Sequence, residues 1–199
     1  MENSVIKEGY DDELSKKASL QERHYKLLRD LQEMCSELPL IFQQKLSYEL
    51  LTDLANSLLD KTVFDIVKGL RDIQVMTEKN FLEKRMKLIN SHKTQKEQVL
   101  KRHKETLTNE LLVHPQNATI LRAKQEKEME DLAKFQEDEV NRLDMKIVME
   151  LDQIVSIQQV TMQKVGVPGF IVSNQPSDIK LQMQLLELIS LLSMKYENE

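Results

Sequence analysis

Four histidines and one cysteine are the side chains of this sequence that could bind a metal ion or attack a substrate. They are His24, His92, His103, His114 and Cys35. No histidine has a second histidine, a cysteine or a pair of carboxylates at a spacing recognised for zinc. Cys35 lies on the apolar face of a predicted helix without a basic neighbour to lower its pKa, so we interpret it as a buried structural residue. We therefore expect no metal site, no cofactor and no nucleophilic catalysis.

Carboxylates are numerous, but their pattern favours helix pairing over acid–base catalysis. Between residues 126 and 144 they alternate with basic residues along one helical segment, which is typical of a solvated pairing face. A glycine-rich phosphate loop is missing as well, because Gly166-x-x-Gly169 lacks the lysine and the preceding strand that such a loop needs. The sequence thus predicts a protein that is not an enzyme, with no catalytic residue and no small-molecule substrate.

The elements that position these side chains are two long charged helical segments of opposite sign. Residues 84–104 are basic, with Glu97 as their only acidic residue, and residues 126–144 are mostly acidic. The turn His114-Pro115-Gln116-Asn117 separates them. Folding back at this turn lays the basic arm along the acidic arm, and such flanking charges specify an antiparallel pairing.

An antiparallel coiled-coil hairpin over residues 62–165, with its turn at 113–117, is the resulting prediction. Thr62 followed by Asp65 is a helix-start signature. Gly166 is a helix-ending glycine that stops the return arm.

Across this hairpin we expect Lys93 and Lys96 to lie near Glu137 and the segment from Glu130 to Lys134. Each surface ion pair contributes only about 0.2–1 kcal/mol, so the collective role of these charges is to set the orientation of the arms. The cluster Lys101-Arg102-His103-Lys104 could alternatively serve nuclear import or nucleic-acid binding, although the acidic arm offers it a simpler partner.

Shorter helical patterns on either side of the hairpin predict a small helical head. Residues 1–18 are polar and carry no apolar stripe, which indicates a mobile tail. Residues 19–61 hold the N-terminal helices of the head, beginning at a capping box at Ser19 and broken before Pro39. A further break at Ser47 is left open by the pattern.

A turn-rich loop over residues 166–176 and a last helix over residues 177–195 complete the predicted head. Thr62 and Val165 share the open end of a hairpin, so the N-terminal helices and the C-terminal helix are expected to meet there. The last helix is apolar on most sides and must therefore be buried by a neighbour.

This last helix and the loop before it supply the candidate protein-interaction residues: Phe170, Leu186 and Ile189. We expect Leu185, Leu188 and Leu192 to pack on the N-terminal helices. Leu186 and Ile189 would then be left to meet a protein partner or a second copy in a homodimer. Phe170 either closes the core of the head or presents an apolar edge to another protein, and the sequence leaves both readings open.

Composition agrees with an all-α fold. Charged residues make up 31% of the chain, which has four glycines and no tryptophan, a mixture typical of long helices and coiled coils. The net charge of -5 gives no reason to expect binding to nucleic acid or to an anionic membrane. No apolar run approaches the ~20 residues of a membrane span, and the N-terminus lacks the pattern of a signal peptide. With a single cysteine, these features predict an intracellular protein in a reducing compartment.

Several long strings of residues are similar to those of a known family. They are 21–25, 37–39, 42–48, 58–70, 77–79, 150–152, 166–170 and 181–189. They resemble the DiGeorge syndrome critical region six protein family, whose insect members are called gonadal protein, over about residues 20–192. The resemblance implies no catalytic residues to carry over, an association with development and with gonadal or neural-crest tissues, and a place in the nucleus or cytoplasm.

The function predicted from the sequence is that of a non-enzymatic interaction or scaffold protein of this developmental family. Its predicted architecture is all-α, with a long antiparallel coiled-coil hairpin and a small head formed by the N-terminal helices and the C-terminal helix. The alternative is a nucleic-acid or chromatin-associated factor that uses the basic arm, residues 84–104, as its binding surface.

Overall fold

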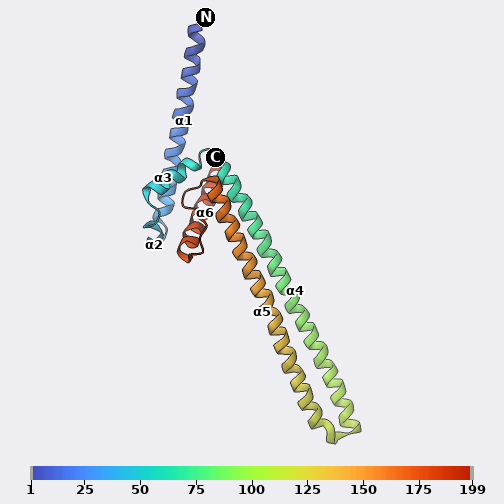
Figure 1. Cartoon of the computed structure of the whole chain (residues 1–199). Helices are drawn as coiled ribbons and strands as arrows, with labels where there is room; N and C mark the ends of the chain where they lie inside the picture. Colours follow the sequence, from blue (N-terminus) through green and yellow to red (C-terminus); the bar gives the residue numbers. More distant parts are fainter. Residues whose placement is uncertain (1, 198–199) are drawn as a thin grey trace. The chain divides into compact units, whose positions relative to one another are not determined.

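The computed structural model describes the backbone of residues 2–197 and the side-chain environments of residues 13–196. Within this range the chain is all α-helical and holds no strand, which confirms the predicted fold class. The elements in order are α1 (Glu2–Ser36), α2 (Leu40–Gln43), α3 (Tyr48–Ser57), α4 (Thr62–Val113), the short 3-10 helix η1 (Pro115–Asn117), α5 (Ala118–Val165) and α6 (Pro176–Glu197) (Figure 1). None of the described helices is long and apolar enough to cross a membrane.

Two compact units make up the chain. The head comprises residues 1–73 and 154–199, and the hairpin unit comprises residues 74–153. Helices α4 and α5 contribute residues to both. The sequence assigned residues 62–165 to the hairpin alone, whereas the first turns of α4 and the last turns of α5 belong to the head. The reason is burial, because Val63, Phe64, Val67 and Met162 lie in the core of the head.

Helix α1 differs most from the expectation. It begins at Glu2, whereas the sequence predicted a mobile tail up to residue 18 and a helix start at Ser19. Ser19 therefore lies inside a helix and does not cap one. Pattern reasoning missed the extension because it relied on an apolar stripe, and residues 13–22 are all exposed. No proline interrupts this stretch, and the one glycine, Gly9, costs a helix only about 1 kcal/mol.

The helix boundaries of the N-terminal part follow from local chemistry. Pro39 precedes α2, and Ser47 caps α3 by accepting a hydrogen bond from the Leu50 amide at 3.2 Å, so the break at Ser47 that the sequence left open is present. Before α4, Lys61 adopts a positive φ of 68°, and Asp60 Oδ1 accepts from the Thr62 amide at 3.0 Å. This side chain satisfies one of the amides that the start of a helix leaves without a backbone partner.

Helix α5 ends at a Schellman motif. Gly166 has a φ of 80°, its amide donates to the Gln163 carbonyl at 3.0 Å, and the Val167 amide donates to the Met162 carbonyl at 3.1 Å. Such a motif needs a residue in the left-handed region, which glycine adopts without steric cost. The chain then enters the loop that leads to α6.

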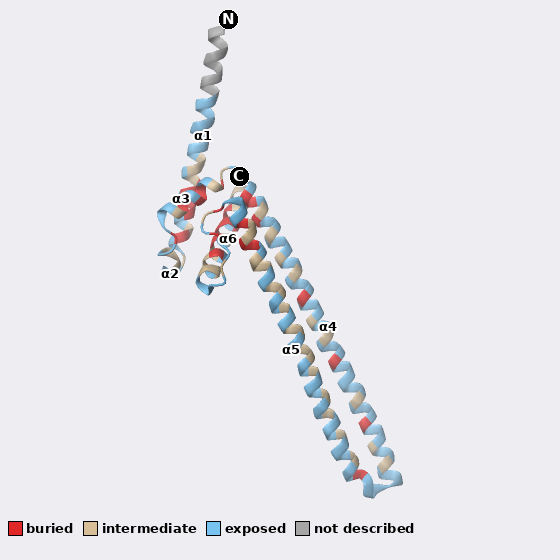
Figure 2. Cartoon of the chain, in the orientation of Figure 1, coloured by how far each residue is buried: buried red, intermediate tan, exposed pale blue. Residues whose placement is uncertain are grey.

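The core of the head is built from both ends of the chain. Figure 2 shows the buried residues gathered on the end of α1, on α3 and on α6. The fully buried side chains include Leu27 and Leu31 of α1, Leu54 of α3, and Leu185 and Leu192 of α6. Together with the buried Leu188, these α6 residues confirm that Leu185, Leu188 and Leu192 face the core.

A buried polar contact also joins α1 to α6. The Asp30 carboxylate is 3% exposed and accepts a hydrogen bond from Tyr196 Oη at 2.8 Å, with Lys195 Nζ at 3.1 Å. Its charge is therefore paired where water is largely excluded, as a buried carboxylate requires.

Candidate protein-interaction site

Burial along the two arms of the hairpin unit recurs every eleven residues. Phe81, His92 and His103 are the buried residues of α4 in this unit. Gln125, Gln136 and Ile147 of α5 are half-buried at the same spacing. Eleven residues correspond to three helical turns of about 3.67 residues, so each set forms one line along its helix. These lines lie in the seam between the arms, and two of the three layers at this spacing are polar.

The layer at His92 is held by three side chains. His92 Nε2 lies 2.9 Å from Glu139 Oε2 of the opposite arm. Gln136 Nε2 donates to the carbonyl oxygen of His92 at 3.1 Å and to Gln95 Oε1 at 3.0 Å. The buried imidazole and the helix backbone beside it therefore both have partners on α5.

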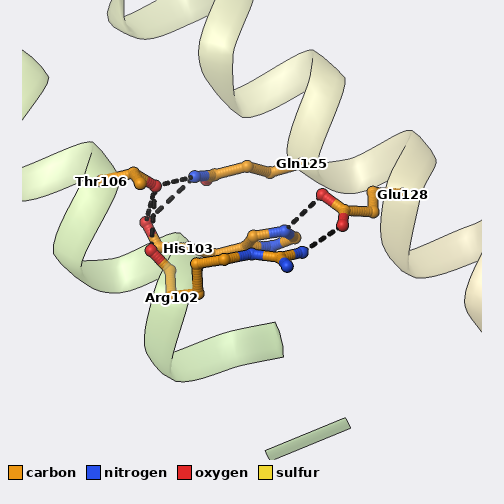
Figure 3. Close-up of polar contacts among 5 residues, drawn as sticks. All are labelled: Arg102, His103, Thr106, Gln125 and Glu128. Carbon is orange, nitrogen blue, oxygen red and sulfur yellow. Dashed lines mark hydrogen bonds and ion pairs between the residues drawn. The ribbon is translucent and has the colours of Figure 1, made fainter. Parts of the chain in front are cut away.

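The layer at His103 repeats this arrangement (Figure 3). His103 Nε2 lies 2.8 Å from Glu128 Oε2, and Gln125 Nε2 donates to the carbonyl oxygen of His103 at 3.0 Å and to Thr106 Oγ1 at 2.9 Å. Arg102 binds the other oxygen of the Glu128 carboxylate. Polar groups at seam positions fix the register of paired helices at some cost in stability, and the two layers can serve that role here.

A third cross-arm contact lies between Arg85 and Asp144. Arg85 Nε donates to Asp144 Oδ1 at 2.8 Å and Arg85 Nη2 donates to Asp144 Oδ2 at 3.0 Å, a bidentate pair. The hydrogen bonds from Arg85 hold the pKa of Asp144 below its ordinary value of 3.8 and, in return, raise the pKa of Arg85. The hydrogen bond from His103, with the charge of Arg102 beside it, likewise lowers the pKa of Glu128 from 4.5.

One face of the hairpin unit carries an apolar groove. Phe81, Leu82 and Ile147, Val148 and Leu151 line it, with Glu78 and the Arg85–Asp144 pair between them. Leu82 is 60% exposed and Val148 is 56% exposed, so the two side chains rise from opposite arms into solvent.

Exposed apolar residues continue along α4 beside this groove. Met86 and Ile89 follow Leu82 at four and seven residues, a spacing that places them on the same side of the helix. We call Leu82, Met86, Ile89 and Val148 the apolar face. Its residues lie outside the seam and pack against nothing that would bury them within the described chain.

The residues singled out from the sequence lie mainly in the head. Phe170 is 4% exposed and Ile189 is fully buried, so both belong to the core. For Phe170 the core alternative is correct. For Ile189 the expectation of an interaction surface is wrong, because the head covers α6 on more sides than one apolar stripe indicates. Leu186 is half-buried and packs against the same core.

The ion pairs across the hairpin also differ from the expectation. Among residues 13–196, Lys93 and Lys96 make no ion pair, and the carboxylates of the opposite arm bind Arg85, Arg102 and the two histidines instead. The antiparallel direction of the arms is the predicted one. The eleven-residue spacing of Phe81, His92 and His103 was the sequence signal that would have revealed the histidines as seam residues.

No cluster of three or more histidine, cysteine or acidic side chains within the described residues is arranged to hold a metal ion. Cys35 is buried in the core of the head, as expected, and burial raises the pKa of its thiol. The candidate site is therefore the apolar face and the groove beside it.

Comparisons with known proteins place the chain among relatives. A family model described as DiGeorge syndrome critical region 6 (DGCR6) protein matches residues 6–199. Protein DGCR6 of Gallus gallus is 46% identical over 187 residues, which cover 94% of this chain and 92% of the relative. Gonadal protein gdl of Drosophila melanogaster is 37% identical over 180 residues, covering 89% and 84%. No solved structure matches the chain.

Proposed function

This chain belongs to the DiGeorge syndrome critical region 6 family, and from that premise we propose that it acts as a protein-interaction protein whose hairpin unit binds a helical segment of protein. The proposal makes it a non-enzymatic scaffold in a developmental process, as the family resemblance implies. The observation that carries it is the apolar face, which leaves Leu82 and Val148 more than half exposed on both sides of one groove.

The physical argument rests on the arrangement of these residues. Single exposed apolar residues are common on protein surfaces and need no explanation. Here Leu82, Met86 and Ile89 form a row beside a groove whose floor, Phe81 and Ile147, is also apolar. Burying such a surface releases about 25 cal/mol for each Å² removed from water. A groove between two helices fits the apolar side of a third helix, which is a recurring mode of peptide recognition.

The polar layers support the same proposal. Each layer ties a buried histidine and its own carbonyl oxygen to side chains of the opposite arm. Slipping one arm along the other would break these hydrogen bonds inside the seam, where an unmade bond costs about 1–3 kcal/mol. The two arms are thereby held in one register, and a groove formed in advance binds its partner with less ordering cost.

Nucleic-acid binding by residues 84–104 has less support. Arg85 and Arg102, two of the basic residues of this arm, are paired with Asp144 and Glu128. The acidic arm beside them would repel phosphates. Filter binding at several salt concentrations distinguishes the two functions, because binding driven by phosphate contacts weakens steeply as salt rises.

The proposal is tested by photo-crosslinking in cells that express the full chain. A photoreactive residue replaces Leu82 in one variant and Lys124 in another, where Lys124 is exposed and borders a different groove with Arg102 and Glu128. We expect crosslinks to protein from position 82 and far fewer from position 124. Equal yields at the two positions, or crosslinks mainly to nucleic acid, would contradict a protein-binding role for the apolar face.

A further inference from the structure

We propose that the partner at the apolar face is a second copy of this chain, docked with the two turns at the same end so that each α4 arm lies on the α5 arm of the other copy. The inference rests on the proposed function and names the partner of that same face. The four arms of the two hairpin units would then form a four-helix bundle.

The argument begins with the residues that directly follow the seam residues on α4. Phe81, His92 and His103 are followed by Leu82, Lys93 and Lys104, which are all exposed. Since these three share the eleven-residue spacing, they form one line along the edge of the face that carries Leu82. From the groove toward the turn, this α4 edge therefore presents one apolar residue and then two basic residues.

The matching edge of α5 has the opposite charge. On α5, the residue that directly follows each seam residue is also exposed. Val148 follows Ile147, Glu137 follows Gln136 and Glu126 follows Gln125, and these three form the α5 edge. From the groove toward the turn, this α5 edge presents one apolar residue and then two acidic residues. The two edges border the same face, because Leu82 and Val148 line one groove.

The cross-arm contacts place the two edges level with each other. The pairs Arg85–Asp144, His92–Glu139 and His103–Glu128 set the register. In that register Leu82 is level with Val148, Lys93 with Glu137, and Lys104 with Glu126.

The charges on both edges remain available. Within residues 13–196, none of Lys93, Lys104, Glu126 and Glu137 takes part in an ion pair. The charged pair inside the groove, Arg85 and Asp144, is already bonded within the chain. Docking therefore covers no unpaired charge at that pair.

Symmetry leaves two ways to stack this face on itself. Two identical chains in a closed dimer are related by a two-fold axis. With the axis along the arms, the turns lie together and α4 faces the partner's α5, so Leu82 meets the partner's Val148, Lys93 the partner's Glu137 and Lys104 the partner's Glu126. With the axis across the arms, α4 faces the partner's α4 and lysines oppose lysines. Charge complementarity selects the first arrangement.

The purified full chain gives the first test. Its mass by sedimentation equilibrium at tens of micromolar should be that of a dimer. A monomer at this concentration overturns the inference. If the chain is a monomer but position 82 still crosslinks to another protein in cells, the dimer proposal fails and the proposed function stands. If the chain is a monomer and position 82 gives no crosslink to protein, both proposals fail.

Charge-swap variants test the orientation. The double variant Lys93→Glu with Lys104→Glu, and separately the double variant Glu126→Lys with Glu137→Lys, should each raise the dimer dissociation constant at least about tenfold. Mixed in equal amounts, the two variants should regain a dimer that contains one chain of each. A chain that carries all four substitutions and pairs with the unsubstituted chain would instead indicate α4 against the partner's α4, and would overturn the proposed orientation.

Two controls accompany these variants. Lys124→Glu with Lys127→Glu changes the net charge by the same amount at exposed positions of the other groove, and should leave the dimer unchanged. The chain with all four swaps has both edges reversed, so it should dimerise with itself and fail to pair with the unsubstituted chain. Helix content by circular dichroism should be equal in all variants. Loss of the dimer in the Lys124→Glu, Lys127→Glu control would show that total charge, rather than the charges on the two edges, governs association.

Discussion

At the scale of single residues, the hairpin unit depends on two buried histidines that stand where apolar residues usually do. His92 and His103 are 9% and 8% exposed, and each has a carboxylate and a glutamine of α5 as partners. An apolar residue at either position would pack in several neighbouring registers with similar energy. Histidine bonds well only where its carboxylate and glutamine are in reach, so these two residues trade some stability for a single alignment.

Glu128 and Asp144 make the free energy of unfolding depend on pH in the acid range, which we call the acid limb of the stability profile. Hydrogen bonds in the folded state lower the pKa of both carboxyls below their unfolded values, from 4.5 and 3.8. Their contribution to stability is thus fully present above those unfolded values and is lost as the pH falls through the lower, folded ones. We expect the free energy of unfolding to decrease at acid pH and to be insensitive to these two groups between pH 6 and about pH 8.

Urea unfolding followed by circular dichroism at a series of pH values measures this effect. Glu128→Gln with Asp144→Asn should flatten the profile below about pH 4.5, because neither amide can be protonated there. Glu105→Gln, a change at an exposed carboxylate of the opposite arm, should leave the profile as it is. An acid limb that stays equally steep in the double variant would show that these pairs are not its source.

At the scale of elements, the loop between α5 and α6 contains a glycine at a position where no side chain fits. Gly169 has a φ of 82°, and a Cβ placed on it would lie 2.7 Å from Leu185 Cδ1 and 3.5 Å from Leu50 Cδ1. Both the backbone conformation and the space therefore require glycine, which explains how Phe170 can reach the core directly after it.

The prediction for this element compares two glycines. Gly169→Ala should lower the free energy of unfolding by about 1–3 kcal/mol through strain and overpacking. Gly69→Ala, within α4 where nothing lies within 4 Å of the new Cβ, should raise it by up to about 1 kcal/mol through helix propensity. Thermal unfolding of both variants provides the measurement. Equal shifts in the same direction would refute the assigned role of Gly169.

At the scale of the whole molecule, the two units differ in how they are held together. The head has a core of fully buried leucines, such as Leu27, Leu54 and Leu185. The hairpin unit has one buried apolar side chain in its seam, Phe81, besides the two histidine layers and Ala118 near the turn. Local opening free energy follows the number of buried apolar contacts, so the units should open separately.

Hydrogen exchange measured by mass spectrometry should show this difference. Backbone amides of α6 around Leu185–Leu192 are expected to exchange most slowly, and amides of residues 95–135 most quickly among the long helices. Within the hairpin unit, amides near Leu82 and Val148 should gain protection at high protein concentration, where the dimer forms. Uniform exchange along α4 and α5 at every concentration would mean that the arms open as one body with the head.

Much of the element layout could be read from the sequence alone. The helix start at Thr62, the break before Pro39 and the helix stop at Gly166 depend on neighbours within a few residues. The antiparallel direction of the arms depends on the summed charge of two long segments, which tolerates exchanges among individual residues. Local and collective signals of this kind are present in the sequence before any packing is known.

Which side chains meet was decided only by the tertiary structure. An apolar stripe shows which side of a helix is buried, but the depth of burial depends on how many neighbours surround it, so Ile189 proved to be core. Charge patterns likewise leave the pairing partner open within a turn of helix. Lysines were expected to pair with Glu137 and the segment from Glu130 to Lys134, whereas the observed pairs join His92 to Glu139 and His103 to Glu128. The apolar face became visible only once the register of the arms was known, because Leu82 and Val148 are 66 residues apart in sequence and become neighbours through that register.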